Sequence, residues 1–120
     1  MNKPTSESLK GAAACMKALQ AATKIERRGF DNPETNDYSV ERYFRDRDEI
    51  KAVFLKSVSA SSSSFQAGFI ATLAEYIHVS LAAGEPDVFD WKPETLMTES
   101  EVKEHREEHI RFALEEESAP

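Results

Sequence analysis

The sequence predicts a small all-α domain, a three- or four-helix bundle with a long loop before the last helix. Apolar residues recur at helical spacing along four stretches of the chain. Residues that typically begin or end helices flank these stretches, and no segment of convincing length alternates like a strand. A chain of 120 residues suits one hydrophobic core. We therefore expect a single domain that spans residues 1–120.

The first helix is expected at about residues 6–28. Thr5 or Ser6 can cap its first turn, and Gly29 suits the position just after its end. Its apolar positions follow helical spacing: Leu9, Ala12, Met16 and Leu19. The segment that follows, "FDNPETNDYS", is typical of a turn, with Asn32-Pro33 as its clearest marker.

The second helix is expected at about residues 39–58, with Asp37 or Ser39 as its cap. The middle of this stretch, "RDRDE", is highly charged, so a break or bend near Asp46 is an alternative to one continuous helix. Its apolar set is Val40, Phe44, Ile50, Val53, Phe54 and Val58.

The third helix is expected at about residues 64–83, after the serine run "SVSASSSSF". Ser63 and Gln66 match a capping box, and Gly84 can end the helix. The serine run lacks the glycines and the lysine of a phosphate-binding loop, so we interpret it as a connector with a cap. One side of the helix is small and predicts close approach of a neighbouring helix, from the same chain or from a second subunit: Ala67, Ala71, Ala74, His78 and Ala82.

The fourth helix is expected at about residues 99–114, followed by a flexible tail at about 115–120. Thr98 and Glu101 form a second capping box, the strongest local signal in the chain. The connection before it, residues 84–97, is longer than most links between helices.

Charge is distributed unevenly along the chain, whose net charge is −7. Residues 1–58 hold 11 basic and 9 acidic side chains, whereas residues 59–120 hold 4 and 13. This balance argues against direct nucleic-acid binding, which usually needs a basic excess. The acidic half suits a protein partner with a basic surface, and a homodimer is a further expectation.

Location is predicted from two absences in the sequence. No apolar run is long enough to cross a bilayer, and the N-terminus lacks the apolar core of a secretory signal. Cys15 is the only cysteine, so no intramolecular disulfide can form. We expect a cytoplasmic protein without membrane contact.

The long acidic connection is the best candidate for a partner-binding site. Aromatic side chains often supply most of the free energy of protein binding. The alternative is that the loop packs on its own bundle. The candidate contacts combine the loop with acidic residues of the last helix: Val88, Phe89, Asp90, Trp91, Glu101, Glu104 and Glu108.

The segment "HREEH" fits the H-x-x-E-H pattern of inverted zinc peptidases. His105 and His109, four residues apart, share one helical face and could bind a metal ion. No third ligand can be identified in the sequence, so these histidines are weak metal candidates. We expect no cofactor.

The sequence therefore predicts a non-enzymatic protein-binding protein of the inhibitor, antirepressor, immunity or adaptor type. Small, acidic, helical chains of this kind are common among accessory proteins of phages and mobile elements. One alternative is a metal-binding helical protein that uses His105 and His109. Another is a nucleic-acid-associated regulator that uses the arginines of the first half: Arg27, Arg28, Arg42, Arg45 and Arg47.

Overall fold

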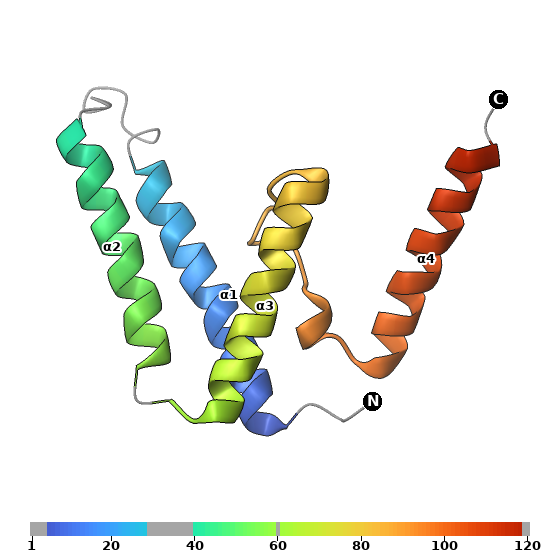
Figure 1. The fold of residues 1–120 in the computed structure, drawn as a ribbon, viewed down its shortest axis with the longest axis horizontal. Coiled ribbons are helices and arrows are strands. Elements are labelled where there is room, and N and C mark those ends of the chain that lie inside the picture. The colour runs from blue at the N-terminus through green and yellow to red at the C-terminus, as the bar shows by residue number, and fades with distance from the viewer. Residues whose placement is uncertain (1–4, 29–39, 60, 119–120) are drawn as a thin grey trace.

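The computed structural model describes residues 5–28, 40–59 and 61–118, and these are entirely helical or irregular, without strands. The all-α prediction is confirmed. The described elements, in chain order, are α1 (Ser6–Arg27), α2 (Val40–Val58), α3 (Ser63–Ala83), the 3-10 helix η1 (Glu94–Leu96) and α4 (Glu99–Ser118). Figure 1 shows α1 between α2 and α3, with α4 on the far side of α3 from α2.

The first turns of α1 and α3 are capped by side-chain oxygens. Thr5 Oγ1 accepts a hydrogen bond from the Ser8 amide at 3.1 Å, as the sequence predicts. The prediction that Ser63 caps α3 in a box with Gln66 is wrong by one residue. Ser62 caps the helix, and its side-chain oxygen accepts a hydrogen bond from the Phe65 amide at 3.2 Å. Consecutive serines are chemically equivalent caps, so the local sequence does not choose between them.

One other predicted boundary differs from the structure. α4 continues to Ser118, four residues beyond the helix end predicted at about residue 114. Glutamates favour helix, and the sequence between Glu99 and Pro120 contains no glycine or proline that would interrupt the helix. α2 is continuous through Asp46. The predicted caps Asp37 and Ser39, the turn at Asn32-Pro33 and the helix end at Gly29 lie outside the described residues.

The charged middle of α2 is held by ion pairs, which explains why it does not break. The Asp46 carboxylate lies 2.8 Å from the Arg28 guanidinium at the end of α1. It also lies 3.6 Å from Arg42 and 3.8 Å from Arg45 on its own helix. Asp46 thus contacts three guanidinium groups, and its ion pair with Arg28 ties α2 to α1.

Helices α1 and α3 form the central pair of the bundle, and two glycines allow their close approach. A Cβ atom added at Gly68 would fall far inside contact distance of the Ser8 carbonyl oxygen. One added at Gly11 would meet the Phe65 carbonyl oxygen in the same way. Within the described residues, no helix of the same chain packs on the alanine side of α3, whose side chains are exposed: Ala67, Ala71, Ala74, His78 and Ala82. Its approach by a helix of a second subunit stays a prediction.

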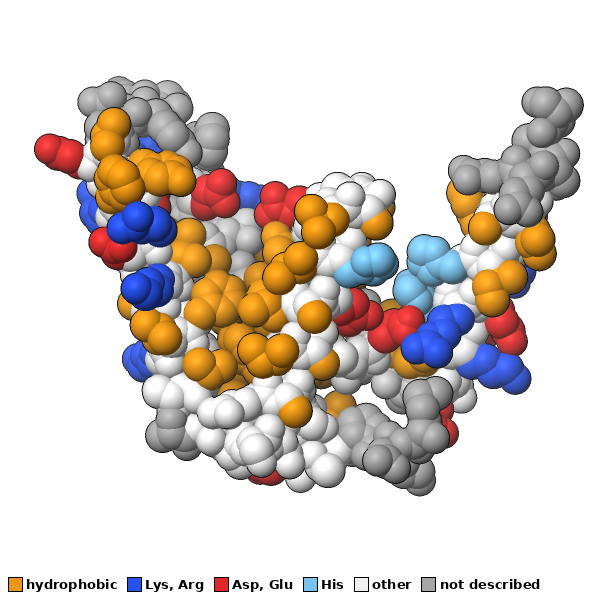
Figure 2. Space-filling model, viewed as in Figure 1, with side chains coloured by type: hydrophobic (Ala, Val, Ile, Leu, Met, Phe, Trp, Pro, Cys, Tyr) orange, Lys and Arg blue, Asp and Glu red, His pale blue; other side chains and the backbone are white. Residues whose placement is uncertain are grey.

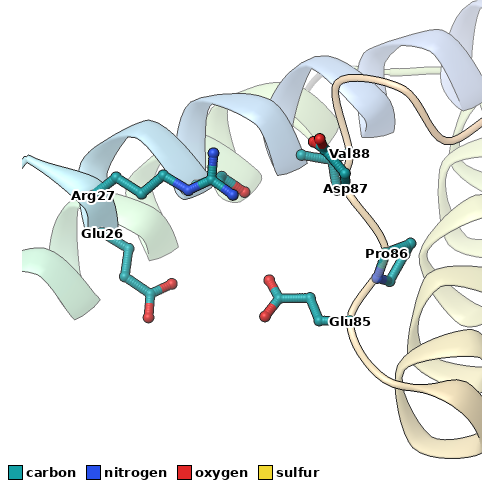
Figure 3. Close-up of a pocket in the computed structure, with 7 residues that line it drawn as sticks. Glu26, Arg27, Glu85, Pro86, Asp87 and Val88 are labelled. Atoms are coloured by element: carbon teal, nitrogen blue, oxygen red, sulfur yellow. The ribbon is translucent and has the colours of Figure 1, made fainter. Parts of the chain in front are cut away.

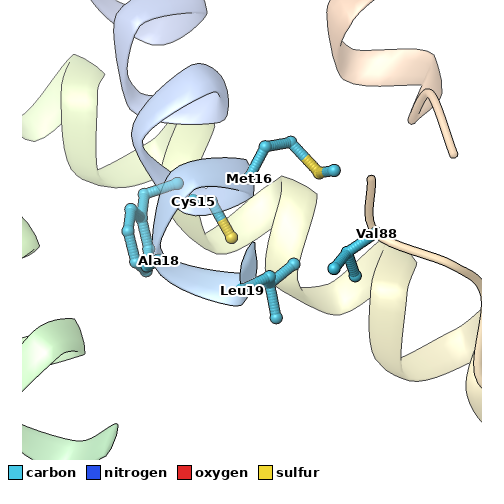
Figure 4. Packing of buried hydrophobic residues seen from close by; sticks show 6 residues of the cluster. Cys15, Met16, Ala18, Leu19 and Val88 are labelled. Atoms are coloured by element: carbon cyan, nitrogen blue, oxygen red, sulfur yellow. The ribbon is translucent and has the colours of Figure 1, made fainter. Parts of the chain in front are cut away.

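The buried core lies where α1, α3 and the connection after α3 meet (Figure 4). Phe69 and Phe54 pack edge to face, with ring centroids 6.0 Å apart. Cys15 is fully buried, and burial raises the pKa of its thiol to about 12. The cluster of buried residues is Cys15, Met16, Ala18, Leu19, Phe69 and Val88.

The last helix projects away from this core. Figure 1 shows α4 diverging from α3, and among the described residues it makes no extensive contact with α1, α2 or α3. The radius of gyration is 17.5 Å, whereas a compact domain of this length has about 13.6 Å. The molecule is therefore a three-helix bundle with a helical arm.

Candidate functional site

The connection of residues 84–97 folds back on its own bundle. Val88 is only 2 % exposed, and its carbonyl oxygen accepts a hydrogen bond from the Gln20 side chain at 3.0 Å. Trp91 is half-buried beside Tyr76, with ring centroids 6.0 Å apart. Val88, a predicted partner contact, is therefore a core residue here, because an apolar side chain in a polar loop is stabilised by burial.

Phe89 and Asp90 stay at the surface of this loop. The Phe89 ring is 43 % exposed, and Lys24 Nζ and Arg27 Cζ each lie 5.9 Å from its centroid. The Asp87 carboxylate accepts a hydrogen bond from the Phe89 amide at 3.0 Å and so fixes the turn. Partner binding by Phe89 and Asp90 stays a prediction.

A pocket of about 480 Å³ lies between the end of α1 and this loop (Figure 3). Glu26 and Glu85 extend toward its open space from opposite sides. The Tyr76 hydroxyl donates to Glu85 at 2.9 Å, and the pKa of Tyr76 is raised, chiefly by burial and then by this carboxylate. The mixed-charge lining consists of Thr23, Glu26, Arg27, Glu85, Pro86, Asp87 and Val88.

The base of α4 is held to the bundle by polar contacts. Arg106 Nε lies 3.1 Å from the Glu94 carboxylate of η1, and Lys92 Nζ lies 2.8 Å from that of Glu101. The Glu94 amide donates to the Glu75 carboxylate of α3 at 2.8 Å. The chain of contacts thus runs from α3 through η1 to the first two turns of α4.

The predicted capping box at the start of α4 is confirmed. The Thr98 hydroxyl accepts from the Glu101 amide, and the Glu101 carboxylate accepts from the Thr98 amide, both at 3.2 Å. These bonds satisfy donors that a helix start leaves unpaired. The pKa of Glu101 is lowered, first by its hydrogen bond from Lys92 and then by that from the Thr98 amide.

This arrangement predicts that the start of α4 loosens in acid. A carboxylate whose pKa is lowered in the folded state stabilises that state above its unfolded pKa, about 4.3 for glutamate. This contribution is lost as the pH falls through the lower pKa of the folded state. Backbone chemical shifts of residues 99–102 should therefore stay helical at pH 6 and move toward coil below about pH 4.

Glu101→Gln supplies the comparison for this acid titration. Glutamine keeps an oxygen that can accept from the Thr98 amide but carries no charge for Lys92. Its chemical shifts should lack the transition that the wild type shows. Glu104→Gln, at an exposed position on the same helix, serves as control and should keep the wild-type transition. Identical titrations of all three proteins would contradict the assigned role of Glu101.

The two histidines of α4 lie side by side, with ring centroids 4.6 Å apart. His105 Nδ1 is buried without a hydrogen bond and lies 3.7 Å from the Glu94 carboxylate. Across the described part of the chain, no group of three or more His, Cys, Asp or Glu side chains is placed to hold a metal ion. The third ligand that the sequence does not identify is thus not found there either.

Large apolar side chains are exposed on α4 and on the surface between α2 and α3. On α4, Ile110, Phe112 and Leu114 are 59–66 % exposed; together with Ala113 we call them the α4 arc. Figure 2 shows further apolar side chains gathered over α2 and α3. We define the α2–α3 face by its exposed apolar residues: Phe44, Leu55, Ile70, Ile77 and Leu81.

The acidic residues predicted for a partner occupy the outer surface of α4. Glu104 and Glu108 are exposed, and Glu101 is partly exposed in the capping box. The α2–α3 face, in contrast, was missed by sequence reasoning. The apolar residues of α3 cover more than the one side that a single core needs, and such breadth is the signal for a second contact surface.

Comparison of the sequence with known proteins finds no match. No protein-family model, no curated protein and no solved structure matches the sequence. Within the described ranges, no helix has both the length and the apolar content needed to cross a membrane.

Proposed function

We propose that the protein functions by binding another protein through α4, as an inhibitor or adaptor, without catalysing a reaction. One observation carries this proposal: a projecting helix exposes Ile110, Phe112 and Leu114 to water by 59–66 %. Burial of apolar area releases about 25 cal/mol per Å², so these side chains favour a complex. Insertion of an amphipathic helix into a groove is a common mode of protein recognition.

The negative charge of α4 predicts a positively charged partner surface. The helix carries eight acidic and three basic side chains, which gives a net charge of −5. A groove with a basic rim would complement Glu104 and Glu108, and such complementarity accelerates association and excludes acidic surfaces. Phe89 and Asp90 are a second, smaller candidate contact beside the exposed Arg27.

Affinity recovery of the tagged chain from cells that produce it tests this proposal. Phe112→Ser/Leu114→Ser removes two exposed apolar side chains and leaves the buried core intact. Recovery of specific partners, quantified by mass spectrometry, should fall at least tenfold. The matched control, Arg111→Ser, changes the opposite side of the same helix and should recover partners like the wild type. Equal recovery by both variants would refute the role of α4.

A further inference from the structure

We propose that α4 binds a second copy of this chain, whose α2–α3 face receives the α4 arc, and that the exchange is mutual. This inference rests on the proposed function, because it names the partner of the same α4 side chains. Mutual exchange of one element between two copies closes a twofold-symmetric dimer. Each copy then covers the exposed apolar surfaces of the other.

The α4 arc needs a concave partner. At about 100° per residue, Ile110 and Phe112 lie on opposite flanks of a strip centred near Ala113. A flat surface can cover only one flank at a time. Figure 1 shows α2 and α3 diverging on either side of α1, and Figure 2 shows apolar side chains on the surface between them. A helix laid between α2 and α3 would bury both flanks of the arc.

The α2–α3 face also matches α4 in chemistry. Its side chains are 45–84 % exposed, against 59–66 % for the large side chains of the arc. Each surface is thus an apolar area of several large, exposed side chains. Packing one on the other removes both from water.

Charges on the two surfaces are complementary. Phe44, Arg47, Lys51 and Leu55 are spaced by three or four residues and so follow one side of α2. The Arg47 guanidinium lies 4.8 Å from the centre of the Phe44 ring, which keeps this cation beside the apolar surface. Glu75 is the only charged residue of α3. The net charge of α4 is −5, so the acidic helix meets a face that is edged by cations.

The arm of the same chain cannot cover this face. Only Met97 and Thr98 separate η1 from α4, and the capping box uses Thr98. Arg106 and Glu94 further hold the base of α4 on the side of α3 that is remote from α2 (Figure 1). The α2–α3 face lies around the other side of α3, beyond the reach of this short link. A second copy has no such restraint.

The chain exposes more surface than a compact monomer of its mass. The accessible surface of the whole chain is 8944 Å². A compact monomer of 13.5 kDa exposes about 6,500 Å². The excess, about 2,400 Å², exceeds the roughly 800 Å² that each partner buries in a standard interface. Mutual exchange would bury part of this exposed surface, because it covers two α4 arcs and two α2–α3 faces.

The mass in solution and a mixing experiment test the dimer. Light scattering at about 50 µM should give about 27 kDa for the wild type, twice the 13.5 kDa of one chain. An arm variant, Phe112→Ser/Leu114→Ser, and a face variant, Leu55→Ser/Ile77→Ser, should each give 13.5 kDa. These residues are exposed, so both variants should keep the wild-type circular dichroism spectrum, and Arg111→Ser should remain dimeric.

Mixing the two monomeric variants is the decisive step. An intact arm of the face variant can still enter the intact face of the arm variant, so the mixture should form a heterodimer at higher concentration. A dimer made by two α4 helices, which would need both arms intact, could not be restored in this way. A mixture that stays monomeric up to about 500 µM would therefore overturn the assigned surfaces.

A monomeric wild type would overturn the second-copy proposal but leave the proposed function to its own test. In that outcome, partner recovery that still depends on Phe112 and Leu114 would identify a different protein as the occupant of α4. Recovery that depends on neither residue would remove both proposals together. A wild-type dimer that both variants keep would show that copies associate through another surface.

Discussion

Replacement of Gly68 by alanine should destabilise the protein by about 1–3 kcal/mol, the range for overpacked cores. Helix propensity alone predicts that the substitution would stabilise the protein, since alanine is favoured over glycine by about 1 kcal/mol inside a helix. The added methyl group would overlap the backbone of Ser8 in α1, and a carbonyl group within a helix cannot rotate away. The two helices must therefore separate, which opens gaps along the whole α1–α3 contact.

Urea unfolding followed by circular dichroism measures this effect. Gly11→Ala should behave alike, because its methyl group would meet the Phe65 carbonyl group. Ala67→Leu is the matched control: it adds more atoms at the neighbouring, exposed position and should change stability by less than about 0.5 kcal/mol. A stabilising effect of Gly68→Ala would show that the helices are not in close contact.

Replacement of Phe69 by alanine should cost about 3–5 kcal/mol of the free energy of unfolding. The Phe69 side chain is 2 % exposed and lies at the centre of the core, edge to face with Phe54. Its removal forfeits the burial of the ring and leaves a cavity that neighbouring helices fill only in part. A small domain is typically stable by about 5–15 kcal/mol, so this one change removes a large fraction of the total.

The exposed Phe89 provides the control for this change. Its ring is 43 % exposed and contacts the cations of Lys24 and Arg27, so Phe89→Ala should cost no more than about 1 kcal/mol. Unfolding midpoints in urea should separate the two variants clearly. Equal losses for Phe69→Ala and Phe89→Ala would contradict the description of the core.

Features that depend on neighbouring residues in the chain were predicted well. The Thr5 cap and the box of Thr98 with Glu101 each involve atoms within one helical turn, so the sequence contains all the information needed. Even the misplaced cap of α3 differs by a single residue within a run of serines. Local hydrogen bonding thus accounts for where α1, α3 and α4 begin.

Features that depend on distant residues were predicted poorly. The alanines of α3 suggest a close helix contact, yet the contact runs through Gly11 and Gly68, whose pairing is not visible in either local sequence. The burial of Val88 against α1 likewise depends on the path of a loop. The exposure of the α4 arc depends on which surfaces remain uncovered after the core has formed.

Because α4 is attached near its first residues, a small tilt there produces a large displacement of its far end. Its 20 residues extend about 30 Å at 1.5 Å per residue, whereas its ion pairs with Lys92 and Glu94 are made near its start, by Glu101 and Arg106. A tilt of about 10° at the base would move the far end by about 5 Å, roughly the pitch of one helical turn. The ion pairs of Glu94 and Glu101 weaken as salt screens them, so ionic strength would set the stiffness of the pivot while the apolar arc at the tip kept its chemistry.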